Sequence, residues 1–333
     1  MPAKPRQSNY EILRIIAMLM VMVCHALGYV QEKDLVGITG ISKLAVSQFC
    51  LICVNVFVMI SGWFGIKASW KGAASLLFQV VFLAALCFLA FWAMGLPVSF
   101  KKDLLPYLAF GYGYWFVISY LILYGLAPVL NAFIEKATEK EYRFVLYFYF
   151  TAEFIYGFLL DKGHFNYGFS ALSFIGLYLL ARYARLYPGR LFSFGKWTDL
   201  LVYASVSILS MLLFWFGYKW FGMGFHLNHY NSPLAIIAAL YFLLFFSKLK
   251  VQSNTINWLA VSALAIYLIH TNSLVYPYFN KHIAYIGESF PHWVSIGMIA
   301  FYLLAFGFVC ILVDKLRIAS WHAIINIKKK ADE

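Results

Sequence analysis

One long apolar stretch carries the two side chains whose chemistry stands out, a guanidinium and an imidazole. The stretch Tyr10–Val30 reads YEILRIIAMLMVMVCHALGYV, and about 20 such residues are enough to cross a bilayer as a helix. Arg14 lies near its start and His25 lies in its far half. A charge at mid-span costs about 2.5–3.5 kcal/mol on insertion scales, so ionisable residues inside spans are candidates for function.

The spacing of Arg14 and His25 predicts that they share one face of that helix. They are 11 residues apart, which corresponds to about three turns and a rise of about 16 Å. A guanidinium could then hold an anionic group near one membrane surface, while a neutral imidazole accepts a proton deeper in the membrane. The alternative is that Arg14 reaches lipid phosphates and His25 only packs inside the protein. The shared face favours a function for the pair.

The composition is that of a membrane protein with many spans. Of the 333 residues, 63% are hydrophobic and 12% are charged, whereas about 25% are charged in a typical soluble domain. The net charge of +12 does not indicate a nucleic-acid partner, because the basic residues are dispersed over short loops. We predict an all-α, polytopic integral membrane protein with about ten transmembrane helices. The predicted spans are 10–30, 41–65, 72–95, 106–131, 143–160, 169–187, 198–218, 232–247, 258–277 and 292–313.

The loop charges predict the orientation of these spans. Most of the 26 Lys and Arg residues fall in the segments that are internal if the N-terminus is internal, so both termini are predicted to be cytoplasmic. Residues 1–333 are predicted to form a single transmembrane domain. Its tail, residues 314–333, is partly amphipathic and basic, and we expect it to lie on anionic lipids of the inner leaflet. The first apolar run lacks a small-residue cleavage site, so no cleavable signal is predicted.

Neither the cysteines nor the outer histidines predict a metal site. All five cysteines lie in apolar runs and are interpreted as packing residues, including Cys50 and Cys53, which are expected to lie one helical turn apart. His226 and His229 lie in the outer loop Tyr218–Ser232 without a nearby pair of carboxylates. That aromatic loop is either an interfacial belt or a rim that receives a sugar, and the sequence leaves both open.

Further polar residues lie inside the other predicted spans. Asn55 is in the second span, Glu153 in the fifth, and His270 and Asn272 in the outer half of the ninth. The presence of amide side chains inside spans is explained at least as well by hydrogen bonds between helices as by a binding site. Glu153 must be protonated or paired. His270 is predicted at a depth similar to that of His25 and is either a site residue or a packing residue.

Several motifs resemble the membrane-bound acyltransferase 3 family, which O-acylates extracytoplasmic polysaccharides and related acceptors. The spacing of Arg14 and His25 is the most specific of them, and the resemblance extends over nearly the whole chain. The other motifs are rich in aromatic residues and are NVFVMISGWF (Asn55–Phe64), YWFVISYLILYGLAPVLN (Tyr114–Asn131), FIGLYLLARY (Phe174–Tyr183) and ALAIYLIHTN (Ala263–Asn272).

The resemblance implies an enzyme in a bacterial cytoplasmic membrane that uses cytoplasmic acyl-CoA, with acetyl as the common acyl group. Acyl-CoA would be a co-substrate, and no permanently bound cofactor is expected. The partners it implies are acyl-CoA, an extracytoplasmic glycan and membrane lipids. His25 takes the place of the family's catalytic histidine and Arg14 that of its donor-binding arginine. Where relatives carry a basic pair after the second span, this chain has Lys67 and Lys71.

The remaining role assignments concern the acceptor and the course of the reaction. His270, Asn272, Asn55 and Trp115 are the candidates for binding the acceptor, and His270 and Asn272 could also stabilise the oxyanion. His25 could act as a general base or could itself carry the acyl group. A transporter for a glycan, a lipid or a small solute also fits ten spans with intramembrane ions. An amino-acid-handling membrane domain of the same fold is a third possibility.

Overall fold

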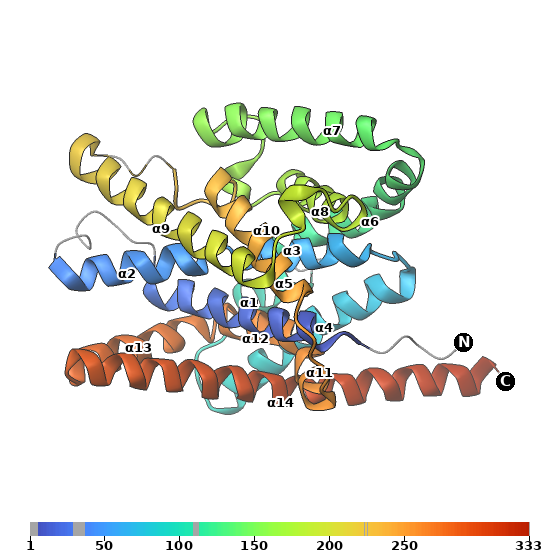
Figure 1. Ribbon diagram of the computed structural model, residues 1–333. Coiled ribbons are helices and arrows are strands. Elements are labelled where there is room, and N and C mark those ends of the chain that lie inside the picture. Colours follow the sequence, from blue (N-terminus) through green and yellow to red (C-terminus); the bar gives the residue numbers. More distant parts are fainter. Residues whose placement is uncertain (1–5, 29–36, 109–112, 223, 225, 333) are drawn as a thin grey trace. The chain divides into compact units, whose positions relative to one another are not determined.

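The computed structural model of the chain describes residues 6–28, 37–108, 113–222, 224 and 226–332. Its regular elements in these ranges are all helices (Figure 1), which confirms the predicted all-α class. Six helical stretches are long and apolar enough to cross a membrane: Ser8–Leu27, Gly40–Phe64, Trp70–Ala93, Trp115–Lys136, Lys196–Phe221 and His292–Ile324. Pro233–Ser247 and Asn254–His270 are shorter apolar helices. The chain is therefore a multi-pass membrane protein by helix length and composition, and the number of ten spans stays a prediction.

The chain forms two compact units that are each discontinuous in sequence. Unit 1 comprises Met1–Ala68 and Ser119–Asn254, and unit 2 comprises Ser69–Ile118 and Thr255–Glu333. Helix α6 contributes its first four residues to unit 2 and the remainder to unit 1. The helices of unit 1 are α1 (Ser8–Leu27), α2 (Gly37–Cys50), α3 (Cys53–Phe64), α6 (Trp115–Lys136), α7 (Glu139–Ala152), α8 (Ala171–Leu186), α9 (Lys196–Phe221) and α10 (Pro233–Ser247). Its short elements are the π-helix η3 (Glu153–Leu159) and the 3₁₀ turns η4 (Asn166–Gly168) and η5 (Arg190–Phe192).

Several predicted spans are interrupted or differ in length. The second is divided by a turn at Leu51–Ile52, and the fifth changes from α7 to the π-helix η3. The fourth begins later and ends later than predicted, because α6 runs from Trp115 to Lys136. The ninth ends at His270 after a further break. In unit 2 the elements are α4 (Trp70–Ala93), η2 (Phe100–Leu104), α5 (Leu105–Leu108), α11 (Asn254–Ala260), α12 (Ala263–His270), α13 (Tyr276–Ser289) and α14 (His292–Asp332).

Local sequence signals explain where the helices of unit 1 begin and end. Thr138 forms a capping box with Glu141, in which the Glu141 backbone N–H donates to Thr138 Oγ1 at 3.3 Å. Ser170 caps α8 by accepting from the Ser173 backbone N–H at 3.2 Å. Pro233 occupies the first turn of α10, where its missing N–H is not needed. Gly222 ends α9 in the left-handed region with a φ of 65°.

Helix α3 is packed among α1, α8 and α10 in the centre of unit 1 (Figure 1). Gly62 makes the close approach to α8 possible, since a Cβ at that position would lie 2.3 Å from the Tyr178 backbone oxygen. Gly176 has the same role between α8 and α7, where a Cβ would lie 2.0 Å from a ring carbon of Tyr149. Small residues that let helices touch closely are typical of packing in membranes.

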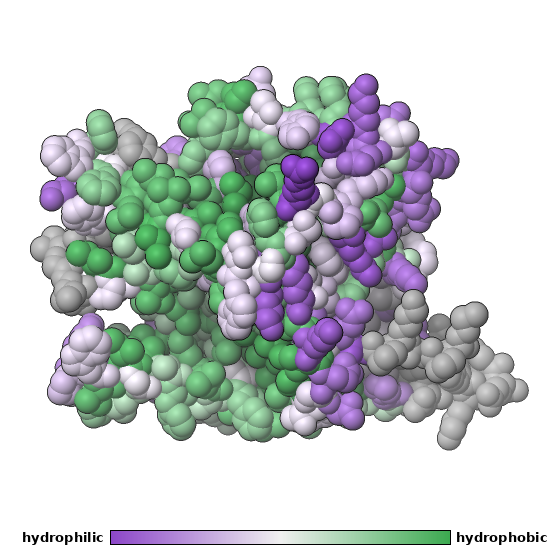
Figure 2. All heavy atoms as spheres, in the orientation of Figure 1, coloured by the Kyte–Doolittle hydropathy of each residue, from purple (hydrophilic) through white to green (hydrophobic). Residues whose placement is uncertain are grey.

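The outer face of α9 is apolar, as expected for contact with lipid tails. Exposed side chains along its middle are coloured as hydrophobic in Figure 2. They belong to Leu201, Ile208, Leu209, Leu212, Leu213 and Phe216. Because burying apolar side chains in water-free surroundings is favourable, such a belt supports a membrane location for unit 1.

Most of the basic residues of unit 1 lie at one end of its helices, whereas Lys43, Lys162 and Lys219 do not. Contacts connect the start of α1 to the ends of α3 and α10, through Tyr10 on Trp63 and through Asn9 donating to Phe246 O. The end of α10 reaches the start of α9 through the ion pair of Lys248 with Asp199. The end of α8 reaches the start of α7, since Tyr183 donates to Glu139. This basic end contains Arg14, Lys67, Arg143, Arg182, Arg185, Arg190, Lys196 and Lys248.

Unit 2 contains a buried ion pair of its own. Arg317 and Asp314 on α14 form a two-point contact, with Nη2 to Oδ2 at 2.6 Å and Nε to Oδ1 at 2.9 Å. Gln79 of α4 donates to the same carboxylate at 3.1 Å. A buried charge is tolerated when it is paired and hydrogen-bonded in this way. The predicted tail is continuous with α14, which runs without a break from His292 to Asp332.

Candidate active site

Helix α1 holds both Arg14 and His25 without interruption. The observed helix runs from Ser8 to Leu27, so the two residues share a face and are separated by about 16 Å along the axis. His25 lies in the last turn, where its carbonyl accepts from the Gly28 backbone N–H at 3.3 Å. The imidazole is therefore carried at the end of a helix rather than in its middle.

Arg14 shares a carboxylate with a second arginine. Its Nη1 lies 3.2 Å from Glu11 Oε2, and Arg6 Nη1 lies 3.6 Å from Glu11 Oε1. Glu11 is buried rather than exposed at the interface. Two guanidinium groups around one carboxylate leave a net positive charge, which suits an anion near the start of α1.

Three cysteines meet beside His25. The thiol of Cys24, the neighbour of His25 on α1, is within hydrogen-bonding range of the Cys50 and Cys53 thiols. The expectation that Cys50 and Cys53 lie one helical turn apart is wrong, because Cys50 ends α2, Cys53 begins α3, and a turn separates them. The contact of Cys24 with Cys53 therefore brings the end of α1 next to the start of α3. Within the described residues, no group of three or more His, Cys, Asp or Glu side chains could hold a metal ion.

Asn55 connects that level of unit 1 to the loop Tyr218–Ser232. Its Nδ2 donates to Tyr230 O at 2.8 Å, while its Oδ1 is buried without a hydrogen-bond partner. The described part of the loop is itself fixed to η3 and η4. His226 Nδ1 bonds Phe158 O at 2.9 Å, and the Tyr230 N–H donates to Tyr167 O at 3.1 Å. The described part of this loop, for which the sequence leaves an interfacial belt and a sugar-receiving rim both open, is therefore folded against η3 and η4.

Buried polar atoms without partners are concentrated around that loop. Among the described residues, they include both side-chain polar atoms of Asn231 and Oγ of Ser232. A Cβ added to Gly157, one turn beyond Glu153, would lie 3.1 Å from Asn231 Nδ2. Each such group costs about 1–3 kcal/mol when it lacks a partner. This region can therefore take up water or a polar ligand with a gain in stability.

Two arginines that the sequence did not single out converge on the end of α3. Arg182 and Arg185 of α8 both donate to the Trp63 carbonyl, at 3.2 and 2.6 Å. The Arg185 guanidinium also lies over the rings of Trp63 and Phe64, at 5.9 and 5.3 Å from their centroids. Nε of Arg182 is buried and has no hydrogen-bond partner. Their three-residue spacing on a predicted helix is the signal that could have identified them, since it puts both on one face.

The aromatic motifs support this end of α3. Tyr178 donates to Asn131 Oδ1 at 2.7 Å and accepts from the Ile66 N–H at 3.0 Å, while Asn131 Nδ2 donates to Ile66 O at 2.9 Å. The hydroxyls of Ser61 and Tyr120 lie 3.1 Å apart. Three of the motifs thus meet around the residues that precede Lys67. They hold the segment after α3 in place.

Lys67 and Lys71 belong to different units. Both side chains are exposed. Lys67 follows the fixed segment of unit 1, whereas Lys71 lies in the first turn of α4 in unit 2, which Ser69 caps by accepting from the Gly72 N–H. Within unit 1, Arg182 and Arg185 are therefore the positive charges found together with Lys67 near the end of α3.

The other predicted acceptor residues lie in unit 2. His270 and Asn272 have no exposed surface. Nδ1 of His270 contacts Ile266 O at 2.5 Å, so this nitrogen carries the proton. Asn272 accepts from the Leu274 N–H at 3.1 Å and reaches the Tyr114 hydroxyl at 3.5 Å. Trp115 begins α6 beside Phe116. His270 and Asn272 are built into the interior of unit 2.

A comparison with protein families places the chain in a class of enzymes. Residues 8–314 match the family described as the acyltransferase domain. The chain belongs to this acyltransferase 3 family, and the resemblance inferred from its motifs is confirmed. Comparisons with curated proteins and with solved structures found no match.

Proposed function

We propose that the protein transfers an acyl group, acetyl by default, from cytoplasmic acyl-CoA to a hydroxyl of an extracytoplasmic saccharide. The single observation that carries this proposal is the family match over residues 8–314. Helix α1, which displays Arg14 and His25 on one face, agrees with it. We place the protein in the cytoplasmic membrane of a bacterium with both termini inside and ten spans.

The basic end of unit 1 supports a cytoplasmic position for the donor. In the proposed orientation this end faces the cytoplasm, because cytoplasmic segments carry an excess of Lys and Arg. Arg182 and Arg185 offer planar guanidinium groups of the kind that bind phosphates at two points. We assign the CoA phosphates to these two arginines with Arg14 and Lys67, and Lys71 remains a further candidate.

The pantetheine arm then extends along α1 towards His25. The rise of about 16 Å between Arg14 and His25 is of the right order for that arm. As the acceptor hydroxyl attacks the thioester carbonyl, neutral His25 takes its proton. The C–S bond breaks, and the CoA thiolate leaves with the proton returned by the imidazolium. If His25 instead carries the acyl group, transfer has two steps. First the imidazole nitrogen forms a C–N bond to the acyl carbon as the C–S bond breaks and the CoA thiolate leaves; then the acceptor hydroxyl forms the C–O bond as the C–N bond breaks, and the imidazole nitrogen so released takes up the hydroxyl proton.

The acceptor enters from the opposite side in this proposal. Asn55 and the polar atoms around Asn231 lie towards the end of unit 1 that is remote from the basic end, and amide groups suit a polyol. Trp115, His270 and Asn272 stay candidates that would act from unit 2. Comparing surface glycans by mass spectrometry with and without the protein identifies the modified sugar.

Transfer in detergent tests this function against transport. Purified protein with labelled acetyl-CoA and a bacterial surface glycan is expected to give labelled glycan without any membrane gradient. Replacing the glycan by one whose hydroxyls are already blocked is the matched control. If no labelled glycan forms in detergent, and vesicles that contain the protein take up solute only with a membrane gradient, the protein is a transporter and the proposal is rejected.

A further inference from the structure

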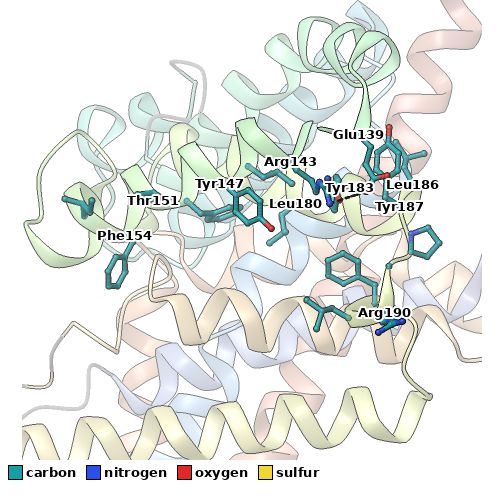
Figure 3. Close-up of a pocket in the computed structure, with 17 residues that line it drawn as sticks. Glu139, Arg143, Tyr147, Thr151, Phe154, Leu180, Tyr183, Leu186, Tyr187 and Arg190 are labelled. Atoms are coloured by element: carbon teal, nitrogen blue, oxygen red, sulfur yellow. Dashed lines mark hydrogen bonds and ion pairs between the residues drawn. The ribbon is translucent and has the colours of Figure 1, made fainter. Parts of the chain in front are cut away.

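A groove on unit 1 shares helix α8 with the proposed donor site but is lined by other residues of that helix, not by Arg182 or Arg185. It is a cavity of about 1090 Å³ between α7 with η3 on one side and α8 with η5 on the other (Figure 3). Its lining includes neither α1 nor α3. Pockets for small ligands occupy about 300–1,000 Å³, so this groove has room for a ligand larger than a simple anion.

The two ends of the groove differ in chemistry. Figure 3 shows Glu139, Arg143 and Arg190 towards one end and Phe154 at the other. Leu146, Phe150, Ile155 and Leu180 make the walls apolar. The charged end belongs to the basic end of unit 1. A ligand that fills the groove must therefore combine a polar head with an apolar tail.

The charged end has an excess of positive charge. Arg143 Nη1 lies 4.0 Å from Glu139 Oε1, a contact that is half exposed to solvent. Glu139 also accepts from the Tyr183 hydroxyl at 3.1 Å. Arg190 makes no ion pair with any carboxylate in the part of the chain that the structure describes. Two guanidinium groups against one carboxylate favour an anionic head, and Arg190 can bind it without breaking an ion pair.

The length of the groove matches one leaflet of a bilayer. From Arg143 to Phe154 the chain advances 11 residues, or about 16 Å in helical geometry. Half of a hydrocarbon core that is about 30 Å thick is about 15 Å. The groove is also accessible from the side, because Tyr147 and Phe154 on its edge are exposed, Tyr147 by 72%. In a membrane that side faces lipid.

We propose that this groove is a binding site for an anionic phospholipid of the cytoplasmic leaflet. Arg143 and Arg190 hold its phosphate, and an acyl chain lies along Leu146, Phe150 and Leu180. The proposal depends on the orientation of unit 1 but not on its enzymatic activity. Basic loops attract anionic lipids in general, whereas this proposal requires a single lipid molecule bound in this groove.

Native mass spectrometry of the full chain tests the site. Protein is extracted from nanodiscs that contain equal amounts of phosphatidylglycerol and phosphatidylcholine. We expect wild type to retain phosphatidylglycerol preferentially, and Arg143→Gln/Arg190→Gln to lose most of that preference, at least fivefold. Lys196→Gln/Lys250→Gln is the matched control, because it removes two positive charges, one at the start of α9 and one two residues after Lys248, and neither side chain lines the groove. This variant is expected to retain the preference.

Two further variants keep the test decisive. Glu139→Gln removes the one carboxylate among the described residues that line the groove and is expected to increase phosphatidylglycerol retention. Arg190→Gln changes one exposed side chain of a 3₁₀ turn and replaces the double variant if that variant does not fold. Equal retention by wild type and the arginine variants would overturn the proposal. Displacement of the lipid by long-chain acyl-CoA at stoichiometric amounts would also overturn it, since the groove would then belong to the acyl donor.

Discussion

The Arg185 guanidinium donates to the backbone carbonyl of Trp63 at 2.6 Å, which ties α8 to the last turn of α3. A carbonyl in the last turn of a helix has no partner within that helix, and a cation near it also interacts favourably with the helix dipole. The same guanidinium lies over the rings of Trp63 and Phe64. One side chain thus stabilises the end of α3 and concentrates charge beside Lys67.

Replacing Arg185 by Lys is expected to weaken donor binding. Lysine keeps the charge but loses the planar group that stacks and bonds at the same time. Loss of a hydrogen bond to a charged group costs about 1.5–3 kcal/mol, so we expect KM for acetyl-CoA to rise roughly tenfold or more, with kcat less affected. Lys250→Arg is the control. An unchanged KM for acetyl-CoA would remove Arg185 from the donor site.

Gly62→Ala is expected to destabilise unit 1. The added Cβ would lie 2.3 Å from the Tyr178 backbone oxygen, and backbone atoms cannot turn aside as a side chain can. Overpacking costs about 1–3 kcal/mol, which should lower the thermal unfolding temperature in detergent. Gly125→Ala on α6 is the matched control, because nothing lies within 4 Å of its Cβ, and it should be neutral or slightly stabilising. Equal unfolding temperatures for the two variants would contradict the observed packing of α3 on α8.

The loop segment 226–232 is expected to lose stability in mild acid because of His229. Burial, and then the neighbouring His226, lower the pKa of His229 to about 4, although Asp161 acts in the opposite direction. The unfolded chain binds a proton near the ordinary pKa of about 6.5, whereas the folded loop does not until about pH 4. Stability should therefore fall as pH decreases from about 6.5 to about 4.

Hydrogen exchange of residues 226–232 between pH 7 and pH 4.5, corrected for the intrinsic rate, measures this effect. His229→Gln should flatten the pH dependence, and His292→Gln, outside the loop, should leave it unchanged. If the loop is equally protected at both pH values in wild type, His229 is not held neutral by the fold.

Asn55→Ala is expected to affect the acceptor more than the donor. The change removes the hydrogen bond to Tyr230 O and frees the loop from α3, at a cost of about 0.5–1.5 kcal/mol. Steady-state kinetics should show a raised KM for the glycan and an unchanged KM for acetyl-CoA. Ser210→Ala, which removes a buried hydrogen bond from α9 to Gln48 Oε1 at 2.7 Å, is a comparison for general destabilisation. A raised KM for both substrates in Asn55→Ala would assign the residue to structure only.

Helix periodicity and apolar length predicted much of the fold, and the particular failures have physical reasons. The stripe of Arg14 and His25 could be predicted because it depends only on the geometry of one helix, α1. The turn between Cys50 and Cys53 could not, since both flanking runs are apolar and no Gly or Pro marks the break. The ninth predicted span has a similar unmarked break at Val261–Ser262, whereas it ends at His270, where Thr271, Asn272 and Ser273 form a turn before the separate helix α13.

Contacts between distant parts of the chain account for what the sequence missed in the site. The sequence places Arg182 and Arg185 among the inner basic residues, and Arg182 in one aromatic motif, but it does not place them at the donor site, because their meeting with Trp63 depends on α8 packing against α3. The aromatic motifs were individually weak, yet Asn131, Tyr178 and Ile66 form one hydrogen-bonded group. Sequence spacing identifies residues on one helix, whereas a site shared between helices requires the fold.

The most direct measurement of the central claim is acetyl transfer by a His25→Gln variant. Glutamine approximates the size and hydrogen bonding of the imidazole but cannot act as a base or carry an acyl group. With labelled acetyl-CoA and glycan in detergent, the account predicts a loss of kcat of at least about 100-fold, the usual scale for a general base. The thermal unfolding temperature of the variant should equal that of wild type, which shows that the variant is folded. Transfer at the wild-type rate by folded His25→Gln protein would contradict the account.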